Sequence, residues 1–180
     1  AKALCGKGYP FFVHMLGDGE LEPQIRRDVE AAGLAECFRF YGYTEPERVR
    51  DVMEKCHIHL FTSNYLEGWG AVVNEGMNSG CVEVVNEQAG AAPYLIRHGE
   101  NGFLYPKGKY EKMEALVMDL FDHWEVRKDM GRAAYETIRQ LWNAENAAKE
   151  LLRFAEGLLE GKILPGVEGP LSVAPVLRPR

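Results

Sequence analysis

The sequence predicts an α/β domain, a Rossmann-like parallel sheet with helices on both faces. Short apolar runs that suit buried strands alternate along the chain with segments whose apolar residues recur every three or four positions. Alternation of this kind indicates βαβ units, in which the strands are parallel. A chain of 180 residues, 46% of them hydrophobic, is long enough to build one such core. In this fold class, ligands bind at the carboxyl ends of the strands.

The first half of the chain is predicted to alternate strictly between strands and helices. We expect strands over residues 11–16, 38–41, 58–61 and 82–85. We expect helices between them over residues 22–32, 45–55 and 71–79. Ile25 and Val29 lie four positions apart on the first helix, and Gly80 stands where it would end the third. Each expected strand therefore leads through a helix to the next strand.

The second half of the chain is predicted to be helical and then irregular. Apolar spacing predicts helices over residues 111–124, 127–142 and 146–160. From residue 161 the sequence is rich in proline and has no periodicity, which is typical of a mobile tail. We therefore expect a Rossmann-like domain over residues 1–145, a separate carboxy-terminal helix over 146–160 and a tail over 161–180.

Two carboxylates flank a glycine-rich turn at the start of the third helix. Glu67 and Glu75 lie eight positions apart in the segment EGWGAVVNE. The first N–H groups of a helix have no partner within the helix and carry the positive end of its dipole, so they suit a diphosphate. Helical Cβ atoms tilt toward the amino terminus, which would direct the Glu75 carboxylate back toward this site. Either glutamate alone would more often be a helix cap or dipole partner than a ligand contact.

Four segments, in order, resemble family 4 of the retaining, two-Rossmann-domain (GT-B) glycosyltransferases. The first two are residues 12–20 (FVHMLGDGE) and 38–43 (FRFYGY). The third is the two-glutamate segment with its flanks, FTS before it and EGMNSG overlapping its end. The fourth pairs AGAAPYLI with GENGFL over residues 89–104. Because an ordered set is far more specific than a lone glycine fingerprint, we use it to form expectations about the fold and the site.

The resemblance implies a site for a nucleoside diphosphate sugar. Glu75 would bind the ribose hydroxyls, and Glu67, the candidate catalytic residue, would bind hydroxyls of the donor sugar. Tyr43 would stack on the nucleobase, although a plain turn aromatic is an equally good interpretation. The full set of expected donor-binding residues is Gly17, Gly19, Gly42, Tyr43, Glu67, Gly68, Trp69, Gly70, Ala71, Val72 and Glu75. No metal or other cofactor is expected.

The chain also departs from the family pattern. The family's first strand of this domain, with its "GRL…KG" cations, has no counterpart, nor does the amino-terminal Rossmann domain on which the last helix would pack. Glu83 stands in a predicted interior strand, so it must find a partner, reach solvent or have a raised pKa. Tyr94 replaces the acidic residue of the family's "PELI" segment. We therefore expect the carboxy-terminal, donor-binding half of an enzyme, inactive alone.

Composition excludes several other classes of protein. The net charge of −6, without a Lys/Arg run, argues against a nucleic-acid partner. No apolar stretch of membrane-spanning length and no signal peptide is found, so a cytoplasmic location is expected and membrane association only through missing parts. The four cysteines favour reduced thiols over disulfides. His57 and His59 share a strand face but lack a third ligand nearby, so a structural role is favoured over a metal site.

Two other functions remain open at this stage. The main alternative is a non-catalytic nucleotide-sugar-binding module that acts with a partner chain. The chain would also fit a nucleotide-sugar epimerase of the same fold. The donor base, the sugar, the acceptor and the oligomeric state are not specified by the sequence.

Overall fold

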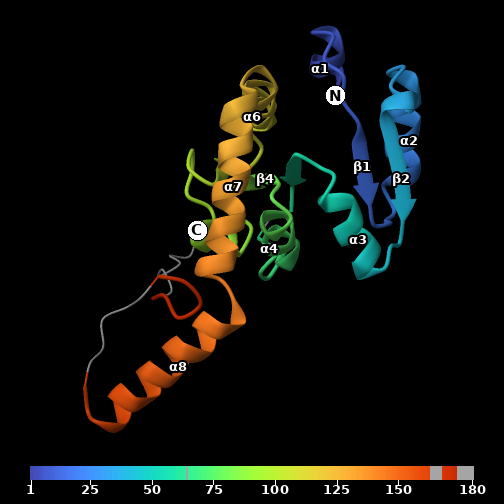
Figure 1. Ribbon diagram of the computed structural model, residues 1–180. Helices are drawn as coiled ribbons and strands as arrows, with labels where there is room; N and C mark the ends of the chain where they lie inside the picture. Colours follow the sequence, from blue (N-terminus) through green and yellow to red (C-terminus); the bar gives the residue numbers. More distant parts are fainter. Residues whose placement is uncertain (64, 163–167, 174–180) are drawn as a thin grey trace.

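A computed structural model of the chain describes residues 1–63, 65–162 and 168–173. Figure 1 shows helices and strands alternating along the first half of the chain. These elements are α1 (Lys2–Gly6), β1 (Val13–Leu16), α2 (Glu22–Ala31), η1 (Ala35–Cys37), β2 (Phe38–Gly42), α3 (Pro46–Met53), β3 (Ile58–Phe61), α4 (Ala71–Asn78), β4 (Val82–Asn86), α5 (Ala92–Leu95) and β5 (Gly102–Tyr105). Three long helices follow, namely α6 (Tyr110–Asp122), α7 (Trp124–Gln140) and α8 (Ala144–Leu159).

The expected α/β class with parallel strands is confirmed, and each predicted helix and strand has a counterpart in the structure. The largest error in a boundary is at the start of α7, which begins at Trp124 rather than at residue 127. The break between α6 and α7 lies at His123, whose φ of −124° and ψ of 78° leave the helical region. The sequence predicts this break two residues later, at 125–126, because Trp124 continues the apolar spacing of α6. Periodicity also missed α5, which has 4 residues.

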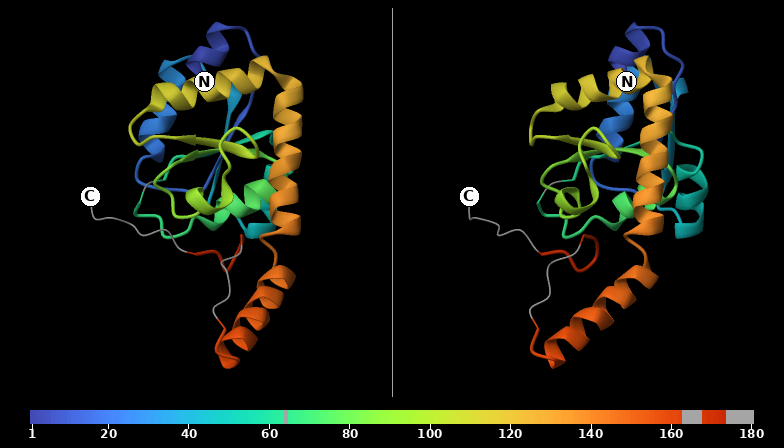
Figure 2. Two further views of the ribbon diagram at one scale, coloured as in Figure 1. Left: turned by 90° about the vertical axis from the view of Figure 1, so that its left-hand side faces the viewer. Right: turned by 60° about the vertical axis from the view of Figure 1, so that its left-hand side comes forward.

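The strands form two parallel sheets rather than one. In the first, β1 pairs with β2, and in the second, β4 lies between β3 and β5. Within the described residues, β1 and β3 pair with no strand on their other edges. The part of the chain that carries β1 and β2 contacts the part that carries β3 to β5 where α1 lies beside α6 (Figures 1 and 2). There the Tyr9 ring lies 5.4 Å from that of Phe121, and both Lys7 and Tyr9 bind Asp122.

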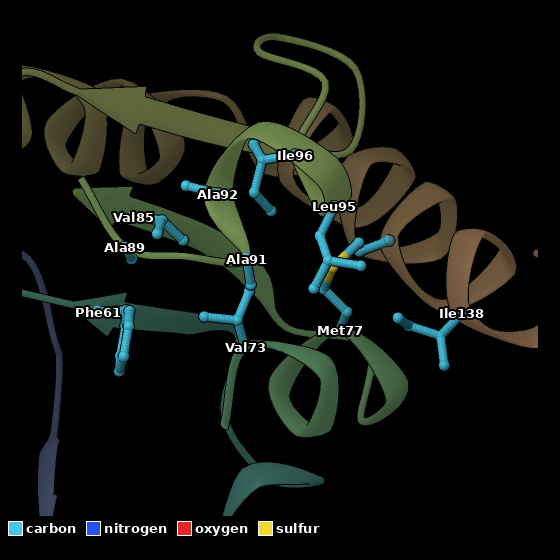
Figure 3. Packing of buried hydrophobic residues seen from close by; sticks show 11 residues of the cluster. Phe61, Val73, Met77, Val85, Ala89, Ala91, Ala92, Leu95, Ile96 and Ile138 are labelled. Carbon is cyan, nitrogen blue, oxygen red and sulfur yellow. The ribbon is translucent and has the colours of Figure 1, made fainter. Parts of the chain in front are cut away.

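Strand β4 is fully buried because helices cover both faces of its sheet. On one face, α4, α5 and the second half of α7 enclose a cluster that includes Phe61, Met77 and Val85. Figure 3 shows Met77 of α4, Leu95 of α5 and Ile138 of α7 pointing toward one another. On the other face, Val82 and Val84 pack with side chains of β5, α6 and α7. The two faces follow the period-two alternation of a strand, which places Glu83 on the same face as Val85.

Helix α8 extends away from the rest of the chain in every view (Figures 1 and 2). Its first turn is capped by Asn143, whose side-chain oxygen accepts from the amide of Asn146 at 2.8 Å. Exposed apolar side chains line the helix, namely Leu151, Leu152, Phe154, Leu158 and Leu159. In the segment expected to be a mobile tail, Gly169 is buried against Leu141. Residues 163–167 and 174–180 of that segment lie outside the described residues.

Candidate functional site

Gly70 is the N-cap residue of α4, directly before the first helical residue. This residue has a φ of 86°, a left-handed conformation that favours glycine, and no side chain caps the helix. A Cβ at Gly70 would lie 2.9 Å from the Phe61 ring, so the end of β3 packs directly beneath the turn. The first turn of α4 contains no acidic residue to occupy the positive end of its dipole. The arrangement leaves this helix end suited to an anion from outside the chain.

Glu67 and Glu75 are both exposed, on either side of this helix end. Glu67 lies in the turn before the helix, and its Cγ would be 3.5 Å from a Cβ on Gly70. Glu75 lies just over one turn into α4. The indole N–H of Trp69 donates to the side-chain oxygen of Asn74 at 2.7 Å, which ties the turn to the helix. The two carboxylates therefore remain accessible beside a turn of fixed shape.

The loop after β4 packs against the same turn. The amide of Ala91 donates to the carbonyl of Trp69 at 2.8 Å. Next to it, a Cβ on Gly90 would lie 1.8 Å from the carbonyl oxygen of Gly68, so only a glycine allows this approach. The loop after β4 and the turn before α4 therefore meet at the carboxyl end of the sheet.

Three aromatic side chains gather beside the turn. The centroid of the Trp69 ring lies 5.6 Å from that of Tyr94 and 5.6 Å from that of Trp142, and the Tyr94 and Trp142 rings are 6.5 Å apart. Separations of this size are typical of packed aromatic pairs. No local sequence pattern indicates this cluster, although Tyr94 in place of an acidic residue is a signal that the surroundings of the turn differ from those in the family. The cluster links α5 and the segment that follows α7 to the candidate site.

The remaining expected residues lie at the carboxyl ends of β1 and β2. The amide of Gly17 donates to the carbonyl of Gly42 at 2.9 Å, and both glycines have positive φ angles, 98° and 64°. Gly19 accepts from the amide of Glu22 at the start of α2. Tyr43 is 76% exposed, which leaves its ring free to stack. A hydrogen bond therefore joins Gly17 to Gly42, and among the described residues no backbone hydrogen bond joins this group to residues 67–70 before α4.

Beneath α4, Glu83 is fully buried and its Oε2 atom lies 2.8 Å from Nδ1 of His59. Burial raises the pKa of Glu83 to about 7, against the lowering effect of His59. Burial lowers the pKa of His59, but the hydrogen bond and charge of Glu83, with the charge of Glu75, raise it overall. The expectation that Glu83 finds a partner or has a raised pKa is confirmed on both points.

The sequence singled out His57 and the four cysteines as further titratable groups. His57 packs against the Trp124 ring at 5.7 Å, and burial, with the nearby charge of Arg127, lowers its pKa. All four cysteines are free thiols, of which Cys81 is buried. In the described part of the chain, no helix is long and apolar enough to cross a membrane, and no His, Cys, Asp and Glu side chains gather into a metal-binding group.

Comparison with characterised proteins identifies the family. The glycosyl transferases group 1 family matches residues 1–137. The chain is 27% identical over 162 residues to the amylovoran biosynthesis glycosyltransferase AmsK of Erwinia amylovora, a match that covers 87% of this chain and 40% of AmsK. It is 27% identical over 143 residues to the D-rhamnosyltransferase WbpZ of Pseudomonas aeruginosa, covering 79% of this chain and 37% of WbpZ. The chain thus spans about two fifths of the length of these relatives.

Solved structures share the fold. TarM superposes with a TM-score of 0.73 at 22% identity, covering 84% of this chain and 30% of TarM. Anabaena HepE in complex with UDP gives a TM-score of 0.67 at 22% identity, covering 83% of this chain and 41% of HepE. The carboxy-terminal domain of the group 1 glycosyl transferase LpcC from Francisella tularensis gives 0.59 at 24% identity, covering 67% and 61%. Since the family match covers more than half of the chain, this protein belongs to the glycosyl transferases group 1 family, with the fold of the carboxy-terminal half of GT-B glycosyltransferases.

Proposed function

We propose that this chain is the donor-binding half of a retaining glycosyltransferase that moves a hexose from a nucleoside diphosphate sugar to a hydroxyl acceptor. The observation that carries the proposal is the uncapped amino terminus of α4, with exposed Glu67 on one side and exposed Glu75 on the other. Free amides of the first turn suit the diphosphate, because they present N–H donors and the positive end of the helix dipole.

The two glutamates have different roles in this proposal. Glu75 accepts hydrogen bonds from the ribose diol, and Glu67 orients the donor sugar beyond the phosphates. The amides of Trp69, Gly70, Ala71 and Val72 meet the sugar and the diphosphate. The backing of the turn by Gly90 and Ala91 supports this assignment, since it holds the amides in place before a ligand arrives. Gly17, Gly19, Gly42 and Tyr43 contribute the nucleobase side.

Neutralisation of the leaving diphosphate is assigned to the protein rather than to a metal ion. Helix amides and basic side chains stabilise developing negative charge without a cation. The two exposed carboxylates, which a divalent cation would need as ligands, are allotted to hydroxyl groups instead. The proposal places this chemistry in the cytoplasm, where free thiols such as those of this chain persist.

The proposal also makes this chain one part of a longer enzyme. The relatives AmsK and WbpZ are matched over only 40% and 37% of their length. The open edges of β1 and β3 suit a parallel strand between the two sheets, which the chain itself does not provide among its described residues. The exposed apolar side chains of α8 suit a second domain. The first strand of this donor-binding domain would fill the gap between the sheets, and an amino-terminal Rossmann domain that carries the acceptor site would cover α8.

A ligand panel tests the proposal directly. Thermal shift and calorimetry with UDP, GDP, ADP and their sugar conjugates should identify one nucleoside diphosphate that binds, with and without a chelator. Binding that needs added magnesium or manganese would contradict the metal-independent assignment, and no binding by any nucleotide would contradict the donor-site assignment. Binding that persists without transfer, even when the upstream coding sequence is joined, would favour the non-catalytic module. Epimerised sugar nucleotide as the product of the transfer test would favour the epimerase.

A further inference from the structure

Strand pairing places two ionisable side chains side by side beneath the candidate site. His59 of β3 is in register with Glu83 of β4, and their side chains meet at 2.8 Å. Because β4 lies between β3 and β5 and under α4, the Glu83 side chain is 0% exposed. Its second oxygen, Oε1, has no hydrogen-bond partner among the described residues. A buried carboxylate needs a partner of opposite charge, and His59 is the one it has.

Helix α4 rests directly on this pair through Gly76. A Cβ on Gly76 would lie 2.1 Å from Oε1 of Glu83 and 3.0 Å from Nδ1 of His59. The missing Cβ therefore lets the helix backbone touch both groups. Gly76 is the residue next to Glu75. Any displacement of the pair consequently displaces the part of the helix that carries the proposed ribose ligand.

His59 also interacts electrostatically with both Glu83 and Glu75. The negative charges of Glu83 and Glu75 both act on His59, one from beneath α4 and one from the helix itself. The other titratable groups nearby are the thiols of Cys81 and Cys56, and burial raises the pKa of both, to about 12 for Cys81, so they stay neutral. His57, two residues away, faces Trp124 and Arg127. When it is protonated, His59 thus carries a positive charge between two acids.

We propose that His59, oriented by the buried carboxylate of Glu83, is a positioning residue for Glu75 and couples nucleotide binding to the proton on its imidazole ring. The inference rests on the proposed function, because it assigns Glu75 to the ribose. With the proton present, His59 donates to Glu83 and offsets the charge of Glu75. When the proton leaves, Glu83 remains as a buried anion without a counter-charge next to Gly76. The packing of α4 on the pair is then less stable.

The decisive measurement follows the His59 ring by NMR titration from pH 5.5 to 9, with and without the nucleoside diphosphate that binds best in the panel of UDP, GDP and ADP. If protonation of His59 favours nucleotide binding, linkage requires that nucleotide binding raises the pKa of His59. A tenfold difference in affinity between the two protonation states would raise the pKa of His59 by about one unit on binding. The His123 ring, which pairs with Asp119 on the surface, serves as the internal control.

Variants separate positioning from simple stability. In Glu83→Gln the proton on His59 loses its buried partner, so the pH at which nucleotide affinity falls should move to a lower value. Asp119→Asn removes the acid from the exposed His123 pair and should leave that pH unchanged. A Glu83→Gln protein that unfolds more easily but keeps the same affinity profile would show a structural role only and overturn the inference. If Glu83→Gln does not fold, the wild-type titration decides.

The outcomes also distinguish this inference from the proposed function. Nucleotide binding with an unchanged His59 pKa would overturn the inference and leave the donor site intact. Absence of nucleotide binding at every pH would overturn the donor site and the inference with it. A raised His59 pKa in the complex, with a shifted profile in Glu83→Gln, is the expected result.

Discussion

Gly90 packs against the backbone of Gly68 so closely that a Cβ at position 90 would lie 1.8 Å from the Gly68 carbonyl oxygen. One residue further on, Ala91 donates its amide to Trp69. The loop after β4 therefore forms the wall behind the turn that begins α4. The shape of that turn depends on two segments about twenty residues apart in sequence, and on the absence of a side chain at one position.

Substitution of Gly90 by alanine should disturb the turn. The added Cβ meets backbone rather than a flexible side chain, so the loop or the turn must move. We expect Gly90→Ala to lower the free energy of unfolding by about 1–3 kcal/mol, the usual cost of overpacking. Urea unfolding measures this change. Gly6→Ala is the matched control, because Gly6 has open space and an ordinary φ, and an equal loss in that variant would contradict the prediction.

Loss of the Glu75 carboxylate should weaken binding of the nucleoside diphosphate itself. A hydrogen bond to a charged group is worth about 1.5–3 kcal/mol. Glu75→Ala should therefore raise the dissociation constant by roughly ten- to a hundredfold. Calorimetry on Glu75→Ala and on Glu114→Ala, an exposed glutamate of α6, gives the comparison. Equal affinity in wild type and Glu75→Ala would remove the ribose role.

Glu67 should contribute to binding of the sugar conjugate but not to binding of the free nucleoside diphosphate. It lies before the helix end that suits the diphosphate, whereas Glu75 lies after it. Glu67→Ala should therefore leave affinity for the free nucleoside diphosphate unchanged and reduce affinity for its sugar conjugate. The two ligands are compared by calorimetry on one protein preparation. Similar losses for both ligands would count against the sugar role, and no loss for either would make Glu67 a local cap.

Local patterns along the sequence were enough to predict most of the fold. The spacing of apolar residues located β3 at its observed ends, Ile58–Phe61, and α4 to within one residue of Ala71–Asn78. These elements are regular and packed on one face, which is the condition under which periodicity is informative. The split into two sheets could not be predicted from apolar spacing. Whether β1 and β3 belong to one sheet depends on contacts between strands that are far apart in the sequence.

The candidate site was predicted unevenly for the same reason. The turn from Glu67 to Glu75 is continuous in sequence, so its glycines and acids could be recognised together. The Trp69, Tyr94 and Trp142 cluster joins three segments, and no local pattern links them. The need of Glu83 for a partner followed from its place in a strand. The identity of that partner required the register of β3 and β4, which sets His59 beside it.

The buried pair should make the stability of the protein depend on pH. The pKa of Glu83 is raised from 4.5 to about 7, and that of His59 is raised above 6.5, so the folded state holds more protons than the unfolded chain in this range. Stability from these groups is therefore complete on the acid side and falls as the pH rises from about 5 through 7 and beyond, because the slope follows the difference in bound protons.

The control for this pH dependence is Glu83→Gln, which cannot titrate at that position. Denaturant unfolding at several pH values should give a flatter profile for the variant than for the wild type. Parallel profiles would mean that other groups cause the dependence. A wild-type stability that rises between pH 5 and pH 8 would require groups with lowered pKa values to outweigh the pair.

Transfer of sugar should require more than these 180 residues. In the proposal the acceptor lies on a second Rossmann domain, and after β5 the described chain contains only helices and irregular segments. The cations of the family's "GRL…KG" segment also have no counterpart here, and removal of one contact that stabilises developing negative charge typically costs about 2.7–4 kcal/mol of barrier. The chain alone should therefore bind its nucleotide sugar without turnover.

Mass spectrometry after incubation with hydroxyl acceptors should find no glycosylated product, while joining the natural upstream coding sequence should yield one. Product from the isolated chain would refute its assignment as half of an enzyme.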